Sequence, residues 1–114
     1  MSAPEPICER EYVAVCDGKR VPFLVRWMKP KPHDEGDWRC DYTFTLATEV
    51  VREASAYGVD STQALVLAFS KVASELETRG FPIFWFEEGD SLGLSSDVAV
   101  QVEADRASRR ASNA

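Results

Sequence analysis

The segment from Gly58 to Gly80 constrains the fold most, because it combines helical spacing with a start signal and a stop signal. Its apolar residues recur every three or four positions, as expected for one face of a helix. They are Leu65, Ala68, Phe69, Val72, Ala73 and Leu76. We expect this face to dock the helix onto the rest of the fold.

The ends of this helix are marked by polar and helix-breaking residues. Asp60 stands at the N-cap, where its carboxylate can accept a backbone N–H bond, and Gln63 can reach back to the Asp60 N–H. Gly80 is predicted to be a left-handed residue after the helix, and Pro82 prevents continuation. The pattern therefore predicts a helix over 60–79 and assigns the polar cluster at its start to capping. Lys71 and Glu75, four residues apart, are predicted to form a surface pair on it.

The segments before this helix show the period of two that is typical of strands. Residues 8–16 and 21–29 are separated by an Asp-Gly turn, and residues 38–46 alternate most regularly. One parity of the third segment is apolar: Trp38, Cys40, Tyr42, Phe44 and Leu46. Such alternation predicts an antiparallel sheet with one face buried. Residues 47–57 fit a strand, a loop or a short helical turn, and a final strand is predicted from Pro82 to Glu87 or Glu88.

These elements predict an α+β domain. We expect an antiparallel sheet of about four strands, in the order β-β-β-α-β, with the long helix packed on one face. A chain of 114 residues suits a single core. The expected domain spans residues 8–95, after a flexible lead over 1–7 and before a partly ordered or disordered extension over 96–114.

The charge balance limits the classes of partner. The net charge is −6, and all of the excess lies in residues 1–96, because the acids and arginines after them cancel. An acidic body is repelled by nucleic acids and by membrane surfaces, so a basic protein is the favoured partner, unless the charge serves solubility alone. No secretory signal is recognised at the N-terminus, which gives the expectation of a cytoplasmic protein.

The residues that usually carry chemistry form no recognisable constellation. Cys8, Cys16 and Cys40 are widely spaced, and His33 is the single histidine, so no zinc pattern is present. The phosphate-binding loops and the serine-hydrolase elbow are also absent from the sequence. We therefore predict no catalytic residue, no metal site and no cofactor.

The aromatic and acidic residues near the end of the expected domain indicate a surface instead. In the segment around Trp85, an aromatic run is followed by Glu87, Glu88 and Asp90. One helix cannot cover both faces of a sheet, so part of the aromatic set is expected to be exposed, like the apolar centre of a protein interface with its charged rim. Self-association through the open sheet face, and packing beneath a terminal arm, are the alternatives.

The combination of the third strand and the helix resembles an uncharacterised family of small bacterial proteins, a domain of unknown function. Its pattern is a W-x-C-x-aromatic strand followed by a G-x-D-x-x-Q-A-L helix. The matching residues are Trp38, Cys40, Tyr42, Gly58, Asp60, Gln63, Ala64 and Leu65. The resemblance covers about residues 8–95 and implies a compact bacterial α+β domain without an assigned activity.

The sequence therefore leads to a non-enzymatic protein-interaction domain as the first hypothesis. An immunity-like or antitoxin-like protein, which masks a basic site on a toxin, is one concrete form of it. The alternative is a small-molecule binding module or minor enzyme. Its pocket would lie between helix and sheet near Cys40, Tyr42 and Asp60.

Overall fold

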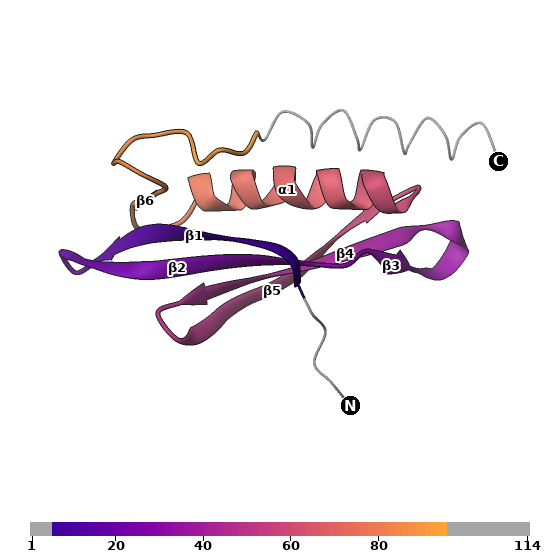
Figure 1. The fold of residues 1–114 in the computed structure, drawn as a ribbon, viewed down its shortest axis with the longest axis horizontal. Coiled ribbons are helices and arrows are strands. Elements are labelled where there is room, and N and C mark those ends of the chain that lie inside the picture. The colour runs from indigo at the N-terminus through magenta and orange to yellow at the C-terminus, as the bar shows by residue number, and fades with distance from the viewer. Residues whose placement is uncertain (1–5, 96–114) are drawn as a thin grey trace.

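The computed structural model describes residues 6–95, and within them one antiparallel sheet carries one helix (Figure 1). The strands are β1 (Pro6–Cys16), β2 (Lys19–Met28), β3 (Lys31–Pro32), β4 (Trp38–Leu46), β5 (Glu49–Gly58) and β6 (Ile83–Phe84). The helix α1 spans Ser61–Glu77, and a single 3-10 turn, η1, spans Asp34–Gly36. The predicted α+β class is confirmed, with six strands in place of about four.

The sheet runs β5-β4-β2-β1-β6, and β3 pairs with the beginning of β4 on the side that faces β2. The register aligns the apolar parities of the long strands, so that Tyr12 lies opposite Phe23, and Val25 lies opposite Phe44. All of these side chains are buried. The alternation in the sequence thus becomes one buried apolar face, the inner face, and one partly exposed face of mixed character, the outer face.

The helix lies on the inner face and packs mainly against β4 and β5 (Figure 1). Its predicted span is confirmed to within two residues at the C-terminal end. Asp60 is the N-cap, and its Oδ1 accepts the Gln63 N–H at 2.7 Å. Gln63 Oε1 accepts from Val59 N at 2.9 Å, one residue before the predicted donor.

The face of α1 that enters the core is rotated slightly from the predicted stripe. The buried helix residues are Ala64, Leu67, Ala68, Ser70, Val72, Ala73 and Leu76. Leu65 and Phe69 are half-buried at the margin, where the Phe69 ring meets the Trp27 ring edge-on with centroids 4.8 Å apart. At the start of the helix, Gly58 at the end of β5 lies directly against the backbone of the buried Ala64.

Two further predictions about the helix are wrong. Lys71 and Glu75 do not form a surface pair, because both reach toward the sheet: Lys71 Nζ donates to the Ser55 carbonyl, and Glu75 binds Tyr42 and Arg52. Gly80 is not among the left-handed residues. The helix ends at Thr78 instead, whose hydroxyl donates to the Glu75 carbonyl at 3.1 Å.

The segment that the sequence left undecided, residues 47–57, forms the fourth long strand, β5. It lacks clear alternation because a register shift opposite Phe44 and Thr45 leaves Val50 and Val51, neighbours in sequence, both exposed. The final strand, predicted from Pro82 to Glu87 or Glu88, is much shorter than predicted, since only Ile83 and Phe84 pair with β1. The predicted lead and extension lie outside the described residues, except for Pro6 and Ile7, which begin β1.

The Asp-Gly turn predicted between the first two strands is confirmed. Asp17 and Gly18 both have positive φ, at 52° and 76°, and Cys16 pairs with Lys19. Positive φ at both central residues of a two-residue hairpin is the type I′ arrangement that Asp-Gly favours. The turn therefore sets the β1–β2 register on which the inner face depends.

Candidate functional site

The loop after β6 carries the aromatic and acidic residues that the sequence singled out. We call residues 85–90 the aromatic loop. The Asp90 carboxylate closes it by accepting three backbone N–H bonds, from Trp85 at 3.1 Å, Phe86 at 2.8 Å and Glu87 at 3.1 Å. These bonds, chiefly the one from Phe86, lower the pKa of Asp90 below its usual range. Asp90 thus shapes the loop, and its oxygens are already used.

Two side chains of β1 attach the chain that follows the aromatic loop to the inner face of the sheet. The Tyr12 hydroxyl donates to the Leu92 carbonyl at 2.7 Å. Arg10 Nη1 donates to the Leu92 and Gly93 carbonyls, each at 3.2 Å. Burial raises the pKa of Tyr12, so its phenol stays a donor at neutral pH. Residues 91–95 therefore cover the part of the inner face that lies beyond the helix (Figure 1).

The Trp85 side chain is largely covered by contacts with other residues of the protein. The Arg10 guanidinium lies 3.8 Å from the centroid of its ring, and the Phe86 ring stacks on it at 4.4 Å with 27° between the planes. Gly93 also approaches it closely, since a Cβ there would lie 2.5 Å from the indole. Trp85, the predicted centre of the interaction surface, thus mainly supports the loop.

Phe86 is the exposed aromatic of this region. Its exposed fraction is 77%, the largest among the exposed large hydrophobic side chains. The sequence argument missed it because it assumed strand parity through residue 86, which would place Phe84 and Phe86 on the same side. The strand ends at Phe84, which is buried at 3% exposure, and Phe86 turns outward from the loop.

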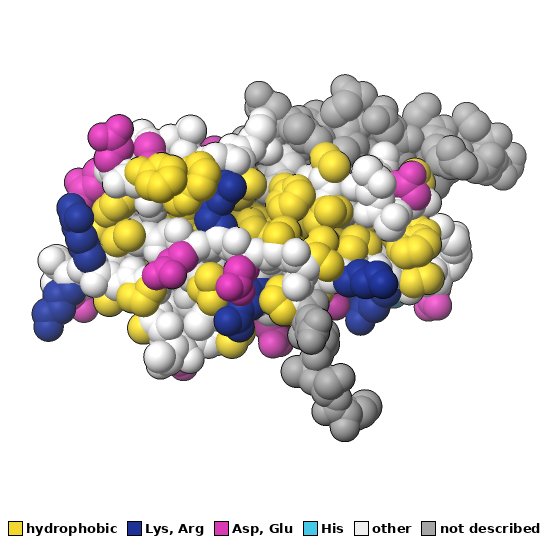
Figure 2. Space-filling model, in the orientation of Figure 1, with side chains coloured by type: hydrophobic (Ala, Val, Ile, Leu, Met, Phe, Trp, Pro, Cys, Tyr) yellow, Lys and Arg dark blue, Asp and Glu magenta, His cyan; other side chains and the backbone are white. Residues whose placement is uncertain are grey.

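The two glutamates beside Phe86 remain at the surface. The Glu88 carboxylate lies 3.9 Å from the Arg20 guanidinium, and both side chains are about two-thirds exposed. Arg20 also lies over the Phe84 ring at 5.2 Å. Within residues 6–95, Glu87 has no cation at ion-pair distance. Figure 2 shows hydrophobic side chains at this end of the molecule with charged side chains of both signs beside them.

A groove of about 490 Å³ runs beside the aromatic loop, between the end of α1 and the chain after β6. Its apolar walls come from Ala73, Leu76, Phe81, Pro82, Ile83, Leu92 and Leu94. Glu77, Arg79, Asp90 and Ser91 lie at its polar parts. The groove places apolar surface next to Asp90, at the end of the aromatic loop.

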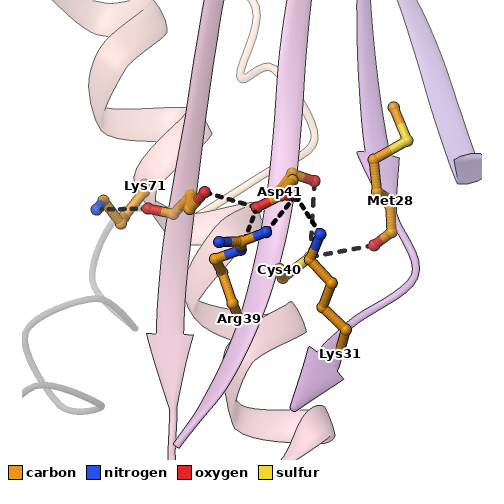
Figure 3. Close-up of polar contacts among 7 residues, drawn as sticks. Met28, Lys31, Arg39, Cys40, Asp41 and Lys71 are labelled. Carbon is orange, nitrogen blue, oxygen red and sulfur yellow. Dashed lines mark hydrogen bonds and ion pairs between the residues drawn. The ribbon is translucent and has the colours of Figure 1, made fainter. Parts of the chain in front are cut away.

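The three residues of the alternative pocket serve separate structural roles. Asp60 caps α1, as described above. The buried Cys40 thiol donates to the Met28 carbonyl at 3.4 Å, and burial raises its pKa to about 12, so it stays protonated and unreactive at neutral pH (Figure 3). Tyr42 is buried, and its hydroxyl donates to Glu75 Oε2. Neither Cys40 nor Asp60 lines the hollow that Tyr42 borders.

Tyr42, Glu75 and Arg52 form a network between sheet and helix. Glu75 Oε1 accepts from Arg52 Nε at 2.7 Å, while its other oxygen accepts from Tyr42. Burial, followed by the hydrogen bond and charge of Glu75, raises the pKa of Tyr42. Because the carboxylate is shared between a phenol and a guanidinium, this arrangement fastens β4 and β5 to α1 and leaves no free base.

The outer face of the sheet carries charged side chains, and several of them are paired. Asp41 receives the Ser55 hydroxyl at 2.6 Å and lies 2.9 Å from Arg39 Nε and 3.4 Å from Lys31 Nζ (Figure 3). Glu9 and Arg26 form a second pair at 3.0 Å. A hollow of about 500 Å³ opens beside Asp41, with Met28, Thr43 and Glu53 in its wall. Val13, Val15 and Leu24 are half-buried apolar side chains on the same face, and self-association through it stays a prediction.

Within residues 6–95, no three side chains of His, Cys, Asp or Glu are grouped closely enough to hold a metal ion. In the same part of the chain, the helix lacks the length and apolar character of a membrane span.

Comparison with known proteins adds a family without an activity. The family model for a domain of unknown function, DUF6968, matches residues 8–96. These bounds agree with the extent of the resemblance seen in the sequence. No curated protein and no solved structure matches the chain at a significant level.

Proposed function

The chain belongs to the DUF6968 family, a domain of unknown function, and we propose from its own surface that it is a non-enzymatic protein-interaction domain. The aromatic loop, with Phe86 at its centre, is the proposed contact surface. The single observation that carries the proposal is an aromatic ring held 77% exposed by a loop that Asp90 closes and that Arg10 of the sheet contacts at Trp85. Exposed aromatic side chains with charged neighbours are typical of interface centres.

The organisation of the loop supports this proposal. Binding through a phenylalanine on a mobile segment costs the entropy of ordering that segment, whereas binding through one on a closed loop costs less. The three N–H bonds to Asp90 and the contacts of Arg10 define the conformation of the loop in the free protein. Ordering of the loop therefore offsets less of the affinity gained at Phe86 than it would for a mobile segment.

The acidic side chains favour a basic protein as the partner. Glu87 and Glu88 lie at the surface beside Phe86, and the whole chain carries a net charge of −6. A basic surface would be attracted to this rim, and the attraction would weaken with added salt. An immunity-like or antitoxin-like protein that masks a basic toxin surface is one form of this function.

The test is an affinity pull-down from the lysate of the natural host at low and at high salt. The bait is the wild-type protein, and a Phe86→Ser, Glu88→Lys variant serves as the surface knock-out. A Val50→Ser variant is the matched control, because Val50 is 53% exposed but lies on β5. We expect a partner protein that the wild type and the control variant capture and that the surface variant does not. After purification, this partner should bind the wild-type protein again.

Equal recovery of every captured protein by the wild type and the surface variant would contradict the proposal. Trp85 is left unchanged in this design, because its contact with Arg10 supports the loop. A loss of binding in a Trp85 variant would not separate a damaged loop from a lost contact.

A further inference from the structure

The aromatic loop contains a stack of rings and charges with one end open. Arg10 lies 3.8 Å from the Trp85 ring, and the Phe86 ring stacks on Trp85 at 4.4 Å. Trp85 thus has two stacking partners, whereas Phe86 has one within residues 6–95. Its 77% exposure means that the ring face turned away from Trp85 is open to solvent.

The charges around this open ring favour a cation and disfavour an anion. Glu87 and Glu88 directly follow Phe86, and both are exposed. The contact of Glu88 with Arg20, at 3.9 Å between exposed side chains, is weak and can be exchanged for another cation. Arg10 is already engaged, because it lies over the Trp85 ring and donates to two backbone carbonyls.

The combination of a flat ring with adjacent carboxylates selects among cations. A guanidinium is planar and weakly hydrated, so it can stack on an aromatic face while its N–H groups bind a carboxylate in a fork. An ammonium is a compact and strongly hydrated charge, and it uses such a site less well. The molecule already contains this kind of contact where Arg10 lies on Trp85.

We propose that the open face of Phe86 binds the guanidinium of an arginine in a basic segment of the partner protein, with Glu87 or Glu88 accepting its hydrogen bonds. This inference rests on the proposed function and specifies the chemistry of its contact. The Arg10–Trp85–Phe86 stack is then extended by one more cation on its open side.

The experiment uses three synthetic peptides of one sequence, Gly-Ser-X-Gly-X-Gly-X-Ser-Gly, in which X is arginine, lysine or citrulline. Citrulline keeps the planar shape of arginine but has no charge. Binding to the full-length protein is followed by fluorescence anisotropy of labelled peptide and by the NMR shift of the Trp85 indole N–H. We expect the arginine peptide to bind about threefold tighter than the lysine peptide and much tighter than the citrulline peptide.

Two variants separate the ring from the charges. Phe86→Leu keeps an apolar side chain and removes the ring, and it should weaken the arginine peptide about two- to fivefold. The Glu87→Gln, Glu88→Gln double variant should weaken both charged peptides and reduce their salt dependence. Val50→Ser should bind all three peptides as the wild type does.

Equal affinity for the arginine and citrulline peptides would overturn the inference, and so would a Phe86→Leu variant that binds like the wild type. Absence of binding at millimolar arginine peptide would overturn it as well. The proposed function fails separately, because it depends on the lysate experiment. A partner lost in the surface variant, together with no arginine preference, would leave an interaction domain whose contact is of another chemical kind.

Discussion

The inner face of the sheet has two covers, which are built on different physical principles. The helix α1 covers β4 and β5 through apolar side chains such as Leu67 and Val72. Residues 91–95 extend the cover beyond the helix and are attached by hydrogen bonds from Arg10 and Tyr12 to their carbonyls. A helix satisfies its own backbone and can therefore pack through side chains alone, whereas an irregular segment needs polar partners for its carbonyls.

This difference has a consequence for function. The helix is part of the core, so its residues have little freedom to change without loss of the fold. The aromatic loop is fastened at a few points and presents Phe86 outward. The second cover can therefore carry a binding surface, and its attachments can be altered one at a time.

The largest effect is expected from Gly58→Ala, which affects the helix cover. A Cβ at Gly58 would overlap the backbone of Ala64, which cannot move without moving the start of α1. We expect a loss of about 3 kcal/mol in the free energy of unfolding, measured by urea denaturation with circular dichroism. Gly80→Ala is the matched control, because a Cβ there meets no atom within 4 Å. Equal unfolding midpoints for the two variants would contradict this account of the helix contact.

The next largest effect is expected from Gly93→Ala, which affects the second cover, residues 91–95. A Cβ there would lie 2.5 Å from Arg10 Nη1 and from the Trp85 ring, and Gly93 has φ of +72°. We expect a loss of about 2 kcal/mol, with increased hydrogen exchange confined to the loop.

Gly89→Ala is the control for the backbone strain in Gly93→Ala. Gly89 has φ of +83° but open space around its Cα. Gly89→Ala should lose only the stability that a positive φ costs an alanine, and its loop should stay in place. If Gly93→Ala unfolds the helix and the loop together, the two covers are not independent.

A smaller effect is expected from Tyr12→Phe, which removes the hydroxyl that binds the Leu92 carbonyl. The ring stays in the core, so the loss should be about 1 kcal/mol. The change in thermal unfolding midpoint, with the Leu92 and Gly93 amide resonances as a local probe, tests this expectation. A variant with unchanged stability and unchanged loop resonances would show that the loop stays attached without the Tyr12 hydrogen bond.

The smallest effect concerns pH and the closure of the aromatic loop. The pKa of Asp90 is lower in the folded state than in the unfolded state. The ionised carboxylate therefore contributes fully to stability above the unfolded-state pKa of about 4, and this contribution is lost as the pH falls through the lowered folded-state pKa. We expect the Trp85 indole resonance to shift as pH is lowered from 6 to 2. Asp90→Asn should abolish that titration, and its persistence in the variant would assign the shift to another acid.

Sequence reasoning succeeded where local signals and periodicity agree. The cap at Asp60, the Asp-Gly turn and the strand over 38–46 were all readable, because each depends on neighbours in the chain. The β5 strand was not assigned, since its register shift exposes two successive valines and removes the period-two pattern. The predicted left-handed Gly80 was wrong because the Thr78 hydroxyl caps the helix two residues earlier.

The candidate site was located by sequence only in outline. The aromatic and acidic segment contains the exposed Phe86 ring, but the residues predicted for the interaction surface included Trp85 and not Phe86. The attachment by Arg10 and Tyr12 joins residues about 80 positions apart in sequence. No local pattern around Arg10 or Tyr12 marks them as partners of that loop.

The sequence by itself determined the class of fold, the helix with its start, and the apolar parity of the main strands, because these depend on spacing along the chain. Only the tertiary structure decided which aromatic side chain is exposed. That outcome depends on where the pairing of β6 with β1 stops, on the closure of the loop by Asp90, and on the stacking of Arg10 over Trp85. The pairing and the stacking depend on contacts between residues that are distant in the sequence, and these contacts help to decide which side chains are exposed.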